Sequence, residues 1–149
     1  MIRDLPDEAA TLAFGAELAS VARPGDVIAL SGGLGAGKTT LARGLLAALG
    51  LQGEAPSPTF AIVQTYGPPE TRLPVAHIDM YRIEAPEDAE ELGLDELRTD
   101  HLLIVEWPER LDADQWSGAL RLALEPLPDG GRRLTATTPP SWEARCMPR

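Results

Sequence analysis

The sequence is poor in cysteine and has no long hydrophobic run. Cys146 is its only cysteine, which excludes an internal disulfide and a cysteine-based zinc site. No stretch approaches the roughly 18 consecutive apolar residues that a membrane-spanning helix requires. The amino terminus is acidic and lacks the apolar core of a secretory signal. These absences favour a cytoplasmic protein without membrane attachment.

The chain also has little positive charge. Its 13 basic residues are outnumbered by 23 acidic ones, and the formal net charge is −10 at pH 7. Nucleic-acid binding depends mainly on cations that meet phosphates, and the arginines here are scattered, with only Arg132 and Arg133 adjacent. Direct, unaided binding of nucleic acid is therefore disfavoured. We expect any role on RNA to pass through a partner protein.

Lysine is almost absent, and the one lysine stands in a complete phosphate-binding loop. Lys38 is the only lysine among the 13 basic residues, and it belongs to Gly32-Gly33-Leu34-Gly35-Ala36-Gly37-Lys38-Thr39. Glycines let backbone N–H groups surround phosphate oxygens, and a following helix directs its positive end at them. The ammonium is a compact charge that suits the β- and γ-phosphates. Nucleotide binding is the leading hypothesis, and an accidental glycine-rich turn is the alternative.

The segments around this loop have the pattern that the motif requires. Residues 26–31 form a short apolar run typical of a buried strand. After Lys38, apolar residues recur at helical spacing as far as Leu49, and Gly50 provides a stop. A strand, a glycine loop and a helix in this order support a phosphate-binding role.

The remaining pattern predicts an α/β P-loop NTPase with a mainly parallel sheet, flanking helices and a C-terminal β-hairpin. We expect one domain over residues 1–138 and a flexible tail over residues 139–149. The other expected elements are a helix over residues 7–21, strands over 59–66, 75–78 and 102–105, a helix that starts at Pro86, and a hairpin of 120–125 with 134–138.

Two acidic residues follow buried strands and are candidates for a second Mg²⁺ contact. Asp79 follows residues 75–78, and Glu106 follows the cleaner apolar run 102–105. In phosphate-loop proteins the loop hydroxyl, here that of Thr39, and a strand-end acid hold the metal. The alternative for both acids is a solvent-facing carboxylate.

Other positions carry weaker signals. Ser57-Pro58-Thr59 follows the loop helix, where many NTPases have a γ-phosphate sensor, although the same tripeptide is often a plain turn. His77 precedes Asp79 by two residues and is more often structural than a general base. Trp107 either packs in the core or marks a partner surface. Since the only lysine is already used, an Asn-Lys-x-Asp guanine reader cannot exist, which favours adenine.

Several ordered motifs make the chain resemble a known family. They are Leu34-Gly35-Ala36-Gly37-Lys38-Thr39-Thr40, Ser57-Pro58-Thr59-Phe60, His77-Ile78-Asp79-Met80-Tyr81-Arg82, Glu91-Leu92-Gly93-Leu94-Asp95-Glu96 and Val105-Glu106-Trp107-Pro108. Over roughly residues 5–110 the chain resembles the TsaE (YjeE) family of small bacterial ATPases. That family acts in the biosynthesis of threonylcarbamoyladenosine in tRNA.

The resemblance implies an ATPase that needs Mg²⁺, hydrolyses ATP slowly alone and works as an accessory subunit. Its partners would be the transferase subunits TsaD and TsaB, which install threonylcarbamoyl on adenosine 37 of tRNA. TsaE itself does not transfer the group, and tRNA would be reached only through the complex.

The resemblance also assigns roles to particular residues. Lys38, Asp79 and Glu106 would be catalytic, with Asp79 an acid near the γ-phosphate, and Thr39 and Glu106 would hold Mg²⁺. The nucleotide would be bound by Gly33, Leu34, Gly35, Ala36, Gly37, Lys38, Thr39 and Thr40, with weaker base or ribose assignments to Thr11 and Arg132. Glycine stands at position 33, where the family usually has aspartate or another residue, which should matter little because the backbone contacts survive.

Two other functions remain open from the residues alone. One is a small-molecule kinase with ATP as phosphate donor. The other is a nucleotide-gated binding module without substantial turnover, in which the Ser57-Pro58-Thr59 loop orders when ATP binds.

Overall fold

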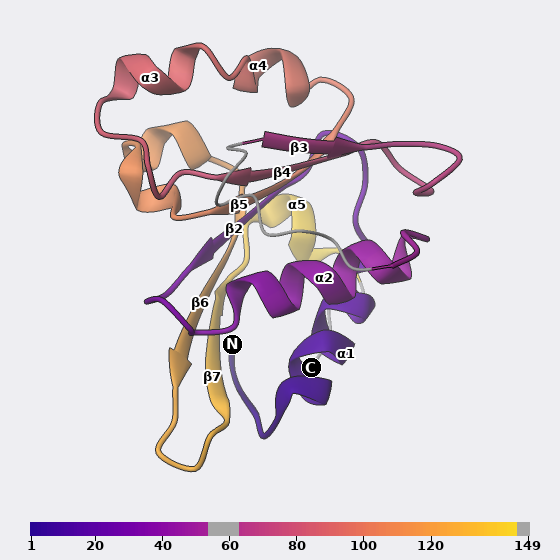
Figure 1. Cartoon of the computed structure of the whole chain (residues 1–149), viewed down its shortest axis with the longest axis vertical. Helices are drawn as coiled ribbons and strands as arrows, with labels where there is room; N and C mark the ends of the chain where they lie inside the picture. Colours follow the sequence, from indigo (N-terminus) through magenta and orange to yellow (C-terminus); the bar gives the residue numbers. More distant parts are fainter. Residues whose placement is uncertain (54–62, 146–149) are drawn as a thin grey trace.

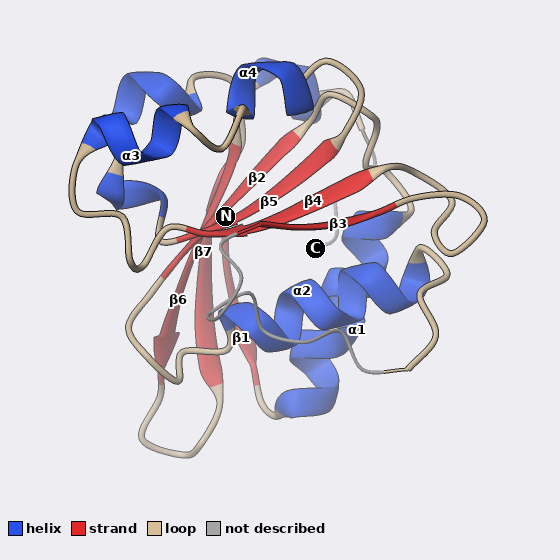
Figure 2. Cartoon of the chain, turned by 45° about the horizontal axis from the view of Figure 1, so that its top comes forward, coloured by secondary structure: helices blue, strands red, loops and turns tan. Residues whose placement is uncertain are grey.

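Short apolar runs form the centre of a sheet that helices cover on both faces (Figures 1 and 2). The computed structural model describes residues 1–53 and 63–145, and within them seven strands join in the order β1-β7-β6-β2-β5-β4-β3. The four inner strands run parallel to one another: β6 (Leu120–Pro126), β2 (Val27–Ser31), β5 (Leu102–Glu106) and β4 (Val75–Asp79). The predicted α/β fold with a mainly parallel centre is confirmed.

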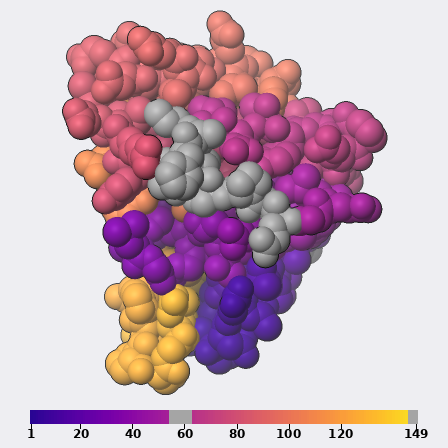
Figure 3. Space-filling model, viewed as in Figure 1, coloured from indigo at the N-terminus to yellow at the C-terminus, as the bar shows by residue number. Residues whose placement is uncertain are grey.

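Antiparallel strands complete both edges of the sheet. The strand β3 (Val63–Tyr66) pairs with β4, and β7 (Arg132–Thr137) pairs with β6 to form the predicted C-terminal hairpin. The sequence did not predict β1 (Ile2–Leu5), which pairs with β7 at the outer edge. Because of this pairing the N-terminal segment and the hairpin lie side by side at one end of the molecule (Figure 3).

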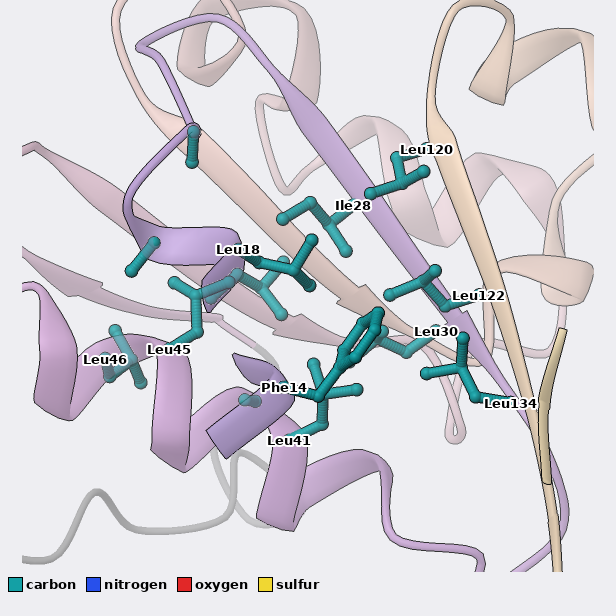
Figure 4. Packing of buried hydrophobic residues seen from close by; sticks show 14 of the residues in the cluster. Phe14, Leu18, Ile28, Leu30, Leu41, Leu45, Leu46, Leu120, Leu122 and Leu134 are labelled. Atoms are coloured by element: carbon teal, nitrogen blue, oxygen red, sulfur yellow. The ribbon is translucent and has the colours of Figure 1, made fainter. Parts of the chain in front are cut away.

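Alternating side chains divide the core between the two faces of the sheet. From β2, Ile28 and Leu30 point toward α1 (Glu8–Ala19) and α2 (Lys38–Ala48), where they pack with Phe14, Leu18, Leu41 and Leu45 (Figure 4). The neighbouring Val27 and Ala29 belong to the opposite cluster. That face is covered by α3 (Pro86–Glu90), α4 (Leu94–Leu97) and the 3₁₀ turns η1 (Pro108–Arg110) and η2 (Ala113–Trp116).

The helix boundaries follow local chemistry. The first helix was expected over residues 7–21 and spans Glu8–Ala19, with the Asp7 carboxylate accepting a hydrogen bond from the Ala10 N–H at 2.8 Å. This is the expected N-cap arrangement. Pro86 opens α3 as predicted. Within the described residues, no helix has the length and apolar character to cross a membrane.

The segment after Thr138 differs from the flexible tail expected over residues 139–149. Residues Pro140–Glu143 form the short helix α5, and the Trp142 side chain is fully buried in the core beneath α1 and α2. Arg145 then forms a two-pronged ion pair with Asp26 at 2.5 and 3.0 Å. Burial of a large aromatic ring and a shielded ion pair therefore fix this segment as far as Arg145. Residues 146–149 lie outside the described part of the chain.

Candidate nucleotide-binding site

The loop between β2 and α2 needs glycine at defined positions. Gly32 has a φ of 142°, and a Cβ there would lie 2.4 Å from the Leu124 carbonyl oxygen of β6. Gly37, the N-cap of α2, has a φ of 103°. At Gly33, in contrast, a Cβ would meet no other atom within 4 Å. The loop backbone therefore depends on Gly32 and Gly37, whereas position 33 has room for a side chain.

The Lys38 ammonium lies inside this loop. Its Nζ donates hydrogen bonds to the carbonyl oxygens of Gly32 at 2.6 Å and Gly33 at 2.9 Å. The Trp107 ring lies beside it, with 4.3 Å between Nζ and the ring centroid. Burial lowers the pKa of Lys38 from its ordinary value, and the nearby carboxylates of Glu106, Glu109 and Asp79 oppose that shift. The loop carbonyls and the Trp107 ring thus hold the ammonium inside the phosphate loop.

Glu106 ends the strand next to β2 and meets the start of α2. Its Oε1 accepts a hydrogen bond from the Thr39 hydroxyl at 3.0 Å, and its Oε2 lies 2.7 Å from His77 Nε2. Only 3% of Glu106 is exposed. Thr39 and Glu106 therefore lie in direct contact, as a shared metal site would require.

Asp79 lies beside Glu106 because β4 and β5 are parallel neighbours in which these two residues are paired. Its Oδ1 accepts a hydrogen bond from the Tyr81 N–H at 2.8 Å, and the residue is 6% exposed. The carboxyl ends of parallel strands meet at one edge of a sheet, where α/β proteins bind ligands. Both predicted strand-end acids therefore reach the phosphate loop.

These groups line one pocket of about 260 Å³. Its walls are formed by Leu34, Gly35, Ala36, Gly37, Lys38, Thr39, Thr40, Asp79, Tyr81, Glu106, Trp107 and Arg132. From the β6–β7 hairpin, which lies beside the loop (Figure 1), Arg132 donates to the Gly35 carbonyl at 2.9 Å. The structure therefore gathers most of the predicted site residues around one pocket.

The aromatic wall of this pocket was only partly foreseen. The rings of Tyr81 and Trp107 lie 5.0 Å apart, and Trp107 has the positive φ of 60° that is rare outside glycine. Tyr81 was not among the predicted site residues. Its position two residues after Asp79, and hence in the turn at the same strand end, was the signal that could have indicated it.

Two predicted residues do not line this pocket, and one predicted segment cannot be placed against it. Thr11 is buried in α1, where its hydroxyl donates to the Asp7 carbonyl oxygen at 3.4 Å, and it does not contribute to the described pocket wall. Gly33 contributes its carbonyl oxygen to Lys38 rather than a surface to the pocket. Their roles in nucleotide binding stay predictions. Ser57-Pro58-Thr59 lies outside the described residues.

The few oxygen ligands in this pocket suit a cation whose other ligands come from phosphate and water. Within residues 1–53 and 63–145, no group of three or more histidine, cysteine, aspartate or glutamate side chains could hold a metal by itself. The Thr39 hydroxyl and the Glu106 carboxylate are hard oxygen donors. Mg²⁺ is usually bound by one or two such groups together with substrate phosphates and waters. The residues present therefore suit Mg²⁺ delivered with a nucleotide.

A larger hollow of about 430 Å³ lies under η1 and η2, lined by Pro108, Leu111, Trp116 and Arg121 among others. It lies on the sheet face opposite α1 and α2, and the phosphate loop does not line it. Its size alone does not indicate phosphate chemistry, so the smaller pocket is the better candidate.

The chain is similar to known proteins over most of its length. A family model described as Threonylcarbamoyl adenosine biosynthesis protein TsaE matches residues 5–134. The chain belongs to the TsaE family. The match extends beyond the motifs at residues 5–110 and includes Arg132 of the hairpin.

Individual members are similar over most of the chain. Two relatives are named tRNA threonylcarbamoyladenosine biosynthesis protein TsaE. That of Streptomyces coelicolor is 40% identical over 113 residues, which cover 75% of this chain and 76% of the relative. That of Bacillus subtilis is 37% identical over 133 residues, which cover 89% and 80%. The crystal structure of Bacillus subtilis YdiB has a TM-score of 0.78 and 30% identity, covering 95% of this chain and 86% of that one.

These similarities define the biological setting. The TsaE family takes part in tRNA threonylcarbamoyladenosine biosynthesis. The predicted family is therefore confirmed.

Proposed function

We propose that this TsaE-family chain is a cytoplasmic, Mg²⁺-dependent ATPase and an accessory subunit of the TsaD and TsaB transferase machinery. One observation carries the proposal. The Lys38 ammonium and the Thr39–Glu106 pair line a single pocket at the carboxyl ends of β2 and β5. This combination of a cation and hard oxygen donors is the one that phosphoryl chemistry requires.

The residues of the loop would bind the phosphates of ATP. The first residues of α2 line the pocket, so their backbone N–H groups would be available to phosphate oxygens, and the helix dipole favours negative charge there. Lys38 would neutralise the β- and γ-phosphates, and Thr40 would contact the α-phosphate. Thr39 and Glu106 would hold Mg²⁺, which when bound would supply positive charge that stabilises the negative phosphates.

Asp79 is the proposed group for orienting the attacking water. It is paired with Glu106 across β4 and β5, and its carboxylate lines the same pocket. One of its oxygens accepts the Tyr81 N–H, which fixes the orientation of the carboxylate. A carboxylate held in this way accepts a hydrogen bond from a water molecule at a defined place.

The net charge supports an indirect relation to RNA. With 23 acidic and 13 basic residues, the chain does not have the cationic excess typical of a protein that binds tRNA unaided. ATP hydrolysis is therefore proposed to act on tRNA modification through the partner subunits.

Depletion of the protein tests the cellular role. We expect threonylcarbamoyladenosine in bulk tRNA to fall severalfold, as measured by mass spectrometry of tRNA nucleosides. Unchanged amounts would rule out a role in this pathway.

Phosphate release with and without TsaD and TsaB tests the activity. Stimulation by the partners is expected, whereas rapid phosphate transfer to a metabolite without them would support the kinase alternative. ATP binding with no hydrolysis under either condition would support the binding module.

The variant Glu106→Gln tests the metal contact. The amide keeps the size of the side chain but lacks the negative charge that attracts Mg²⁺. We expect Mg²⁺-dependent ATP hydrolysis to fall by roughly 100-fold or more, while nucleotide binding in EDTA changes by less than about threefold. Phosphate release and fluorescent-nucleotide titration measure the two quantities.

The matched control is Glu109→Gln, which removes the same charge from an exposed residue of the neighbouring turn η1. It should hydrolyse ATP almost as the wild type does. Equal losses in the two variants would mean that Glu106 acts only through the general charge of this region.

A further inference from the structure

Glu106 has a second partner that its expected metal role does not use. His77 lies on β4 with its ring fully buried, and its Nε2 is 2.7 Å from Glu106 Oε2. The other oxygen of the same carboxylate accepts the Thr39 hydroxyl at 3.0 Å. Glu106 is therefore held from two sides, by a residue of α2 and by a residue of β4.

The chemistry of this contact assigns the proton. A carboxylate accepts hydrogen bonds, so this contact requires the form of His77 in which Nε2 carries a proton and donates it. The second ring nitrogen, Nδ1, is buried and has no hydrogen-bond partner in the described part of the chain. Among residues 1–53 and 63–145, the one polar contact of this ring is thus its bond to Glu106.

A buried polar pair at this position calls for a reason. Its apolar neighbours are Val75 on the same face of β4 and Ile104, which is paired with it on β5. An apolar residue at position 77 would avoid leaving Nδ1 without a partner. Burying a polar pair is at best weakly stabilising compared with well-packed apolar residues. Such pairs near a metal site commonly fix the orientation of the ligand.

We propose that His77 is a positioning residue that orients Glu106 toward Mg²⁺. Its Nε2–H holds Oε2, and Oε1 is thereby kept beside the Thr39 hydroxyl, where the two oxygens together face the phosphate loop. Without this donor the carboxylate can rotate about its side-chain bonds and leave Thr39. This inference rests on the proposed Mg²⁺-dependent function and adds to it a residue outside the pocket wall.

Two substitutions separate positioning from packing. The amide nitrogen of glutamine in His77→Gln can take the place of Nε2, whereas the shorter side chain of His77→Asn places its amide near Nδ1 and withdraws the donor from Glu106. The measurement is a Mg²⁺ titration of ATP hydrolysis and of fluorescent ATP-analogue binding, together with binding in EDTA. Urea unfolding reports whether each variant folds.

For His77→Asn we expect the half-saturating Mg²⁺ concentration to rise by about 10- to 100-fold, with binding in EDTA unchanged. His77→Gln should stay within about threefold of the wild type. The control is His101→Asn, because His101 is the chain's other histidine and contacts Asp100 at the surface instead. An unchanged Mg²⁺ requirement in a folded His77→Asn would overturn the inference and leave the proposed function intact.

The wild-type protein supplies a test that does not depend on any variant. Nitrogen-15 NMR of its two histidines should find His77 protonated at Nε2, both alone and with Mg²⁺ and ATP. A ring protonated only at Nδ1 would overturn the inference. Wild-type hydrolysis that needs no Mg²⁺ would instead reject the proposed function, and the inference with it.

Discussion

Replacing Lys38 with alanine is expected to weaken ATP binding by at least about 100-fold. The ammonium supplies charge-assisted hydrogen bonds to phosphate oxygens, and each bond to a charged group contributes roughly 1.5–3 kcal/mol. Two such bonds correspond to about 3–6 kcal/mol, or at least two orders of magnitude in the dissociation constant. Isothermal titration of ATP with Mg²⁺ measures this loss directly.

The folded state should change much less than the affinity. In the structure, Lys38 Nζ bonds the carbonyl oxygens of Gly32 and Gly33, both of which lie at the partly exposed edge of the loop. Water can replace the ammonium at such partly exposed carbonyls. We therefore expect a small effect on the free energy of unfolding, which a urea titration separates from the effect on binding.

Arginine is not expected to rescue position 38. The ammonium fits between two loop carbonyls and lies 4.3 Å from the Trp107 ring centroid, whereas the guanidinium is larger and planar. Lys38→Arg therefore keeps the charge but should bind ATP almost as poorly as Lys38→Ala.

The matched control for charge is Arg23→Ala, at an exposed residue in the turn before β2. This variant removes one positive charge at the end of β2 that lies away from the loop, and it should leave affinity within about threefold. Because Lys38 is the only lysine, an amine-directed reagent gives a second readout. ATP should protect its side chain from modification, and retained affinity in Lys38→Ala would disprove the phosphate-loop assignment.

The parts of the fold that could be predicted are those with local signals. The β2 run, the glycine loop and the apolar face of α2 lie within residues 26–49, so neighbouring residues are enough to indicate them. The strand β5 was equally clear because residues 102–105 form a continuous apolar run, and all of them are buried in the structure. The strand-end position of Asp79 and Glu106 followed from the same logic, since parallel strands end at one edge of a sheet.

The parts that were missed depend on distant residues. The strand β1 contains two charged residues in four and exists through its pairing with β7, including an ion pair between Asp4 and Arg133. Trp142 is fixed by a core built from α1, α2 and the sheet. The contact of His77 with Glu106 required β4 and β5 to be neighbours. Strand order of this kind cannot be obtained from residue spacing along a single chain.

Replacing Gly44 with alanine is expected to destabilise the protein by about 2 kcal/mol, although alanine is the better helix former. Gly44 is buried in α2, and a Cβ built there would lie 2.3 Å from the Leu12 carbonyl oxygen of α1. In an exposed helix the same change would stabilise by roughly 1 kcal/mol. Here the methyl group meets backbone on the neighbouring helix, which cannot move aside as a flexible side chain can.

The approach of the two helices is reciprocal. Gly15 is buried in α1, and a Cβ there would lie 2.3 Å from the Leu41 carbonyl oxygen of α2. Gly15→Ala should therefore cost a similar amount. The double variant should cost less than the two single losses together, because the first methyl group already separates the helices and the contacts are shared.

Thermal unfolding measures the effect, and for a chain of this size about 2 kcal/mol corresponds to roughly 4–8 °C in Tm. Gly67→Ala is the matched control, since Gly67 has no positive φ and a Cβ there meets nothing within 4 Å. It should change the free energy of unfolding by less than about 0.5 kcal/mol. A Gly44→Ala protein as stable as the wild type would show that α1 and α2 can separate without cost. Since α2 begins at Lys38, the helix contact would then place no constraint on the position of the loop lysine.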